Sequence, residues 1–174
     1  DALVAGINLN LFNKNCDRVK MANIAQMVNV LQSVILTDGE KMLLTPTWHV
    51  FNMYKCHQDA ELVESCVETG LVGLEDEYQV PDLTESVSMG KDGKLHITMT
   101  NLSLDEDRQI EAVLAETTVK SVTGEILTGA MDAHNTFEAS NEVHTVSFDG
   151  CKAEGNRITF TIPARSVLHL AVEL

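Results

Sequence analysis

The stretch ITFTIPARSVLHLAVEL, Ile158 to Leu174, decides the fold class. Ile158, Phe160 and Ile162 alternate with threonines, and after the Pro-Ala-Arg break the apolar residues again fall on every second position. Successive side chains of a strand point to opposite faces, so a period of two predicts strands with one buried face. The stretch therefore predicts two consecutive antiparallel strands.

The same alternation recurs upstream, where Leu95, Ile97 and Met99 alternate with His96, Thr98 and Thr100. Many short strands separated by turns are typical of an antiparallel β-sandwich of the jelly-roll kind, which we expect over residues 59–174. The turn signals between the expected strands are Lys91-Asp92-Gly93, Thr123-Gly124-Glu125, Asp149-Gly150 and Gly155-Asn156.

Residues 1–58 have a different character, with helical spacing and one continuous apolar run. Three helices and one strand cannot bury a strand that is apolar on both faces, so we interpret this part as the last βα elements of a larger (β/α)8 barrel. The expected elements are a helix that starts at Asp1 with Leu3, Ile7 and Leu11 on one face, a short helix from Asp17 to Met27, a doubly buried strand over Val28–Leu36, and a helix from Thr45-Pro46 to about Gln58.

Composition excludes some functions. The chain has 174 residues, a hydrophobic content of 44% and a net charge of −14. Such an acidic chain does not suit nucleic acid or an anionic membrane as partner. No apolar run reaches transmembrane length, and no signal peptide is visible.

The cysteines and histidines show no metal-ligand or disulfide spacing, so no metal or cofactor is expected. We expect four reduced, mostly buried thiols, which favours a cytoplasmic protein and leaves a periplasmic one open. The pair His57 and Asp59 is interpreted as solvated. The four cysteines are Cys16, Cys56, Cys66 and Cys151.

Three segments carry a resemblance to a known family. The first is DALVAGINLNLFNKNCDRVKMANIAQMVNVLQSVILT (Asp1–Thr37), in which polar residues interrupt an apolar run as they do beside a polar cavity. The others are LTPTWHVFNMY (Leu44–Tyr54) and AHNTFEASNEV (Ala133–Val143) with the final strands. Together these segments resemble the C-terminal part of glycoside hydrolase family 51 α-L-arabinofuranosidases.

The resemblance implies a retaining hydrolysis of terminal α-L-arabinofuranosyl residues by two glutamates about 5–5.5 Å apart. In the family both glutamates lie upstream of the matching segment, so no catalytic residue is assigned here and the chain alone is expected to be inactive. Its implied partners are an arabinose-containing oligo- or polysaccharide, the upstream barrel and a further copy of the protein.

One substrate-binding residue carries over, Gln26, because the family's glutamine at this place hydrogen-bonds the arabinofuranose. A glutamine amide offers both a donor and an acceptor to neighbouring hydroxyls. We expect Asn23 and Asn29 to hold strand and helix ends, Arg18 to form a salt bridge inside the barrel, and Trp48 to pack in a core or domain interface.

The alternatives are a carbohydrate-binding module and a purely structural or interaction module. Carbohydrate-binding modules display aromatic rings on one face, but only 5% of this chain is aromatic. Phe160 is expected in the core because it alternates with Ile158 and Ile162. Two exposed, coplanar rings among Tyr78, Phe137, Phe148 and Phe160 would favour a binding module.

Overall fold

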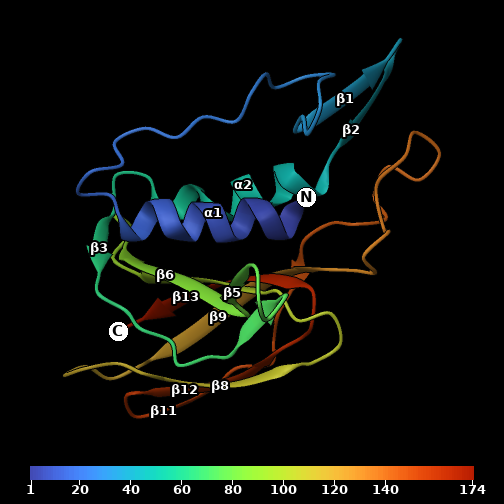
Figure 1. Cartoon of the computed structure of the whole chain (residues 1–174). Coiled ribbons are helices and arrows are strands. Elements are labelled where there is room, and N and C mark those ends of the chain that lie inside the picture. Colours follow the sequence, from blue (N-terminus) through green and yellow to red (C-terminus); the bar gives the residue numbers. More distant parts are fainter.

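The computed structural model describes residues 1–174 and has three layers (Figure 1). The helices α1 (Ala2–Lys14) and α2 (Pro46–Tyr54) lie together on one face of a six-stranded sheet. A short 3-10 turn, η1 (Lys55–His57), continues α2. The other face of the large sheet packs against a three-stranded sheet.

All strand pairs in both sheets are antiparallel, and the mainly antiparallel β class predicted from the sequence is confirmed. The large sheet has the order β10 (Val146–Ser147), β9 (Ser121–Thr128), β13 (Ser166–Glu173), β7 (Leu95–Asn101), β6 (Leu83–Met89) and β3 (Glu61–Val63). The small sheet has the order β11 (Lys152–Glu154), β12 (Arg157–Ile162) and β8 (Arg108–Val113).

Two hairpins stand outside these layers. The hairpin of β1 (Ile35–Asp38) and β2 (Lys41–Leu44) projects away from the sheets next to the start of α2 (Figure 1). The second hairpin joins β4 (Leu71–Gly73) to β5 (Gln79–Pro81).

The main hydrophobic core lies between the two sheets. Leu95, Ile97 and Met99 of β7 share it with Ile158 and Phe160 of β12, and all five are buried. The predicted alternation is therefore confirmed at both strands, and Phe160 is a core residue as expected.

The other face of β7 differs from the expectation of a half-buried strand. His96, Thr98 and Thr100 are buried as well, because α1 and η1 cover this face of the sheet. A polar face under a helix must find hydrogen-bond partners within the protein. His96 and Thr98 find such partners, whereas the buried Thr100 hydroxyl has none.

The helices α1 and α2, at the two ends of residues 1–58, begin where the sequence predicted. Asp1 is the N-cap residue of α1, and Thr45 caps α2 by accepting a hydrogen bond from the backbone nitrogen of Trp48. Pro46 occupies the first helical position of α2, where its missing N–H costs nothing.

The short helix predicted from Asp17 to Met27 is wrong. Beyond residue 18 the chain is irregular up to Met27, and the side chains of Met21 and Met27 are 78% and 61% exposed. Short helices need an apolar face packed on the protein, and most of these residues are exposed.

The doubly buried strand predicted over Val28–Leu36 is also wrong. Val28 makes a single parallel bridge to Ile35, and regular pairing begins only at Ile35, with β2. Asn29 and Gln32 have positive φ angles of 55° and 60°, which no extended strand accommodates. A buried parallel strand needs partners on both sides, and the described residues supply one antiparallel neighbour. The assignment of residues 1–58 to a barrel stays a prediction.

A buried ion pair fixes the start of β6. Asp82 is 1% exposed, and its carboxylate accepts hydrogen bonds from Thr69 and Arg108. Burial alone would raise the pKa of Asp82, but these hydrogen bonds and the guanidinium charge outweigh it and hold the pKa below its ordinary value.

Candidate functional site

Gln26, the predicted sugar ligand, lies on the segment of residues 15–34 that runs back over α1 toward the β1–β2 hairpin (Figure 1). Its side chain is exposed and forms no hydrogen bond within the protein. The next residue is anchored, because the carbonyl of Met27 accepts a hydrogen bond of 3.1 Å from the backbone nitrogen of Ile35. The Gln26 amide is therefore free while its backbone is tied to the hairpin.

Asn29 closes the loop that follows. Its Nδ2 donates to Thr37 Oγ1 and its Oδ1 accepts from the Thr37 backbone nitrogen, both at 2.8 Å. The amide thus holds the loop against β1 in the left-handed conformation that asparagine tolerates best after glycine. Asn29 has the structural role at a strand end that the sequence predicted.

A cavity of about 150 Å³ lies between this segment, α1 and the start of α2. Asn23 and Gln32 line it, together with apolar residues such as Phe12 and Phe51, whereas Gln26 does not. Asn23 was expected to hold a helix or strand end, but its side chain forms no hydrogen bond and lines the cavity instead.

Arg18 and Trp48 both belong to residues 1–58. The Arg18 side chain is exposed and donates to Asn15 Oδ1 at 2.7 Å, so the predicted salt bridge is absent. Trp48 is partly buried, and its ring packs edge-on to His49 with centroids 5.1 Å apart. It packs within the protein rather than presenting an open stacking surface.

No glutamate gains a catalytic role from the structure. Glu142 follows Asn141. It is exposed in the loop between β9 and β10, in the sheet part of the chain and not at the end of a barrel strand.

Sequence reasoning missed a buried polar layer between α1 and the large sheet. Asn10 is its centre, because Oδ1 accepts hydrogen bonds from Tyr54 Oη, Ser86 Oγ and Thr98 Oγ1 at 2.9, 3.0 and 2.9 Å. The helix approaches the sheet closely at Gly6, where a Cβ would lie 2.4 Å from a threonine hydroxyl of β7. A glycine and an asparagine four residues apart on one helix face were the available signal.

His57 belongs to this layer and is not solvated as expected. Its Nδ1 lies 2.7 Å from Ser88 Oγ and its Nε2 lies 3.0 Å from Thr98 Oγ1. Burial, helped by the nearby His169 and His96, lowers the pKa of His57 to about 4. The imidazole is therefore neutral and serves as a hydrogen-bonded spacer between η1 and the sheet.

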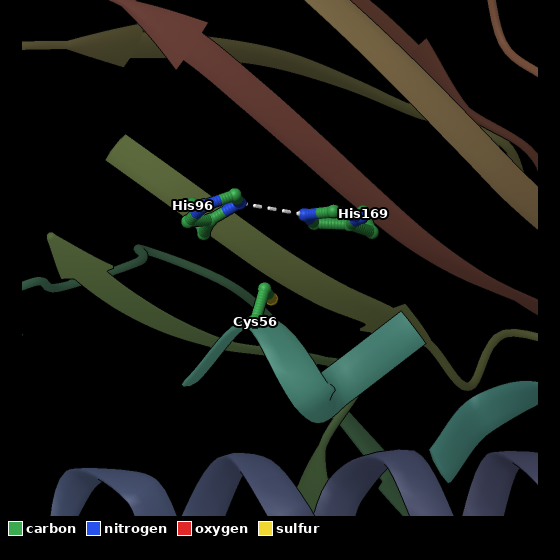
Figure 2. Close-up of side chains that lie close together, drawn as sticks. All are labelled: Cys56, His96 and His169. Carbon is green, nitrogen blue, oxygen red and sulfur yellow. Dashed lines mark hydrogen bonds between the residues drawn. The ribbon is translucent and has the colours of Figure 1, made fainter. Parts of the chain in front are cut away.

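The structure also gathers three side chains that can ligate a metal, although no sequence spacing indicated them. They are Cys56, His96 and His169, and Figure 2 shows them facing one another from η1, β7 and β13. The four cysteines differ from the expectation of mostly buried thiols. Cys16 and Cys66 are exposed, whereas Cys56 and Cys151 are only partly buried.

The exposure and orientation of the four aromatic rings argue against a carbohydrate-binding module. Of the four rings, Tyr78 is 84% exposed, Phe137 is partly buried and Phe160 is in the core. Phe148 packs edge-on to Phe160, with an interplanar angle of 85°. Two exposed coplanar rings are therefore absent from this set.

The fold and this region define a mainly antiparallel β domain with helices on one face and an irregular segment outside its core. The family described as "Alpha-L-arabinofuranosidase C-terminal domain" matches residues 1–166. The chain therefore belongs to this family of C-terminal domains. None of its helices has the length and hydrophobicity needed to cross a membrane.

Individual relatives agree with the family. The chain is 41% identical, over 99% of its length, to an intracellular exo-α-L-arabinofuranosidase of Bacteroides ovatus and covers 34% of that protein. The crystal structure of a GH51 arabinofuranosidase from Xanthomonas axonopodis pv. citri superposes with a TM-score of 0.94 at 40% identity, covering 99% of this chain and 35% of that one. The crystal structure of an α-L-arabinofuranosidase from Thermotoga maritima in complex with arabinose matches with a TM-score of 0.84 at 27% identity. The match covers 100% of this chain and 38% of that one. The chain thus spans about a third of the length of the relatives it matches.

Proposed function

We propose that these residues are the C-terminal part of a retaining α-L-arabinofuranosidase that removes terminal arabinofuranosyl groups. The single observation that supports this most strongly is the match along nearly the whole chain to enzymes named arabinofuranosidases, each about three times longer. The two catalytic glutamates then belong to the part of those enzymes that this chain does not match. By itself the chain is expected to be inactive.

Gln26 is the residue that we assign to the sugar. Its amide has no partner within the protein, so both its donor and its acceptor are available to adjacent hydroxyls. The closed loop that begins at Met27 holds it at a fixed place beside the β1–β2 hairpin. A free amide on an anchored backbone suits one wall of a sugar pocket.

The exposed apolar surface near Gln26 supports contact with the rest of such an enzyme. Large apolar side chains stand exposed along this part of the chain, among them Leu31 at 90%, Leu11 at 58% and Val4 at 55%. An apolar surface of this kind is typical of an interface. The β domain then serves as a scaffold that braces a barrel, and we propose a cytoplasmic homo-oligomer.

Hydrolysis of 4-nitrophenyl α-L-arabinofuranoside tests the proposal, with this chain alone and with the longer enzyme that contains it. Only the longer enzyme should be active. Loss of two hydrogen bonds worth about 1 kcal/mol each predicts that Gln26→Ala lowers kcat/KM by about 30-fold. The matched control is Gln58→Ala, since Gln58 is an exposed glutamine beyond η1.

Two results would contradict these assignments. Activity in the isolated chain would mean that its own carboxylates perform the hydrolysis. An unchanged kcat/KM in Gln26→Ala, with an active parent enzyme, would remove Gln26 from the pocket and leave the family assignment intact.

A further inference from the structure

Two histidines of neighbouring strands face each other between the sheet and η1 (Figure 2). His96 Nδ1 and His169 Nε2 are 3.0 Å apart, and the two rings are stacked with an interplanar angle of 26°. Cys56 reaches the same point from η1, and one ligand atom from each of the three residues lies within 4.8 Å of the other two. The three residues come from segments that are far apart in the sequence.

Each histidine is oriented by a carboxylate on its outer nitrogen. His96 Nε2 lies 3.1 and 3.2 Å from the two oxygens of Asp92. His169 Nδ1 lies 3.0 Å from Glu125 Oε1. Ionised carboxylates only accept hydrogen bonds, so both outer nitrogens carry a proton.

With its proton on the outer nitrogen, a neutral imidazole has a lone pair on its inner nitrogen. Two lone pairs 3.0 Å apart repel each other unless a cation lies between them. A proton can fill this place, and so can a metal ion. The nearby cysteine sulfur favours the metal, because thiolate and imidazole together are preferred ligands of zinc.

We propose that Cys56 Sγ, His96 Nδ1 and His169 Nε2 bind a Zn²⁺ ion, with water as the fourth ligand. Binding forms one Zn–S and two Zn–N bonds and releases the thiol proton, together with any proton held between the rings. The occupied site would carry a net charge of about −1. The Zn²⁺ ion is opposed by the Cys56 thiolate and by the carboxylates of Asp92 and Glu125, which are paired with the histidines.

The spacing of the two nitrogens, 3.0 Å, is close to what tetrahedral zinc requires, and the sulfur within 4.8 Å would have to move closer to them. Zn–N bonds of about 2.05 Å and a Zn–S bond of about 2.3 Å place the nitrogens about 3.3 Å apart and each about 3.6 Å from the sulfur. The histidines need to separate by only a few tenths of an ångström. Their carboxylate partners already form the outer shell that holds zinc-binding histidines in one tautomer.

The site would join two of the three layers of the fold. Cys56 belongs to η1 in the helical layer, whereas both histidines belong to the large sheet. The two carboxylates lie on the solvent side of the cluster, since the side chains of Glu125 and Asp92 are 36% and 51% exposed. Zinc would therefore stabilise the attachment of the helices to the sheet.

Zinc chloride titration by calorimetry tests the site in the full chain, in a background where Cys16, Cys66 and Cys151 are serine. We expect one Zn²⁺ per chain and a higher unfolding temperature with zinc. Co²⁺ in place of zinc should give a thiolate-to-metal charge-transfer band and the strong d–d bands of a tetrahedral site. Cys56→Ser should abolish the charge-transfer band, and Glu125→Gln should weaken zinc binding by about 10- to 100-fold.

The matched control is His134→Gln, which removes an exposed histidine outside the cluster and should change nothing. Near-ultraviolet circular dichroism establishes that each variant keeps the fold. Equal zinc affinity with and without Cys56, or no zinc binding in the background chain, would overturn the proposal and leave a proton between the two histidines.

Discussion

Replacing Asn10 with alanine should loosen α1 from the large sheet. Asn10 is 1% exposed, and its amide joins two strands and a helix. In addition to the three bonds that Oδ1 accepts, Nδ2 donates to the carbonyl and hydroxyl oxygens of Thr84, at 3.2 and 3.0 Å. Alanine removes all of these bonds and leaves buried hydroxyl groups without their partner.

The loss of unfolding free energy follows from the hydrogen bonds that the partners of Asn10 keep after the substitution. Ser86 and Thr98 keep a hydrogen bond to each other at 2.9 Å, and Tyr54 keeps a longer bond to the carbonyl of Gly6 at 3.3 Å. The remaining loss corresponds to about three net hydrogen bonds, or about 3 kcal/mol at about 1 kcal/mol each. That is a large part of the about 5–15 kcal/mol by which a domain is stable.

Urea unfolding, followed by the fluorescence of the single tryptophan on α2, measures this loss. The matched control is Asn8→Ala, which makes the same change in helix propensity on the same helix. Asn8 is exposed and bonds only to the Val4 carbonyl of its own turn, so the control should change the free energy of unfolding by less than about 0.5 kcal/mol.

A double-mutant cycle with Tyr54→Phe isolates the central bond. The two substitutions should cost less together than the sum of their separate effects, because they remove the same 2.9 Å bond. The reasoning is refuted if Asn10→Ala is no more destabilising than Asn8→Ala, or if the two substitutions add without coupling.

Three further predictions follow from the packing, charge and burial of single residues. Gly6→Ala should lower the midpoint of urea unfolding, because the new Cβ would lie 2.4 Å from Thr100 Oγ1. Alanine normally stabilises a helix, so a raised midpoint would contradict this contact. The lowered pKa of Asp82 stabilises the fold above the ordinary carboxyl value of 3.8, and this stability is lost as the pH falls through the folded pKa. Asp82→Asn should therefore flatten the acid side of a stability-against-pH curve, and an unchanged curve would count against the ion pair. Burial raises the pKa of Cys151 to about 11, so at pH 8 this thiol should react with a disulfide reagent far more slowly than the exposed Cys16, and equal rates would be the adverse result.

The strands of the core could be predicted because their signal is local. Ile158 and Phe160 point to one side wherever the strand lies, so alternation alone identifies the face that is buried. Thr45 and Pro46 likewise predict a helix start from chemistry within one turn.

The errors arise where burial depends on distant parts of the chain. Thr98 was expected on an open face because its polarity matches water, but α1 covers it and Asn10 supplies its partner. The run that begins at Val28 is apolar enough for a buried strand, yet its conformation depends on neighbours that the run itself does not encode. Gln26 could be proposed from the resemblance only, since a sugar pocket is defined by several walls at once.

The place of β13 between β9 and β7 has a consequence for how the protein folds. β13 pairs with both neighbours, and its partner in β7 lies far back in the sequence, as Ser166 pairs with Asn101. Closing such loops is slow, since their entropy is lost before the strand contacts form. Until β13 inserts, β7 and β9 each present an open edge to other chains. Conditions that delay this one insertion should therefore favour aggregation during refolding, even where the finished domain is stable.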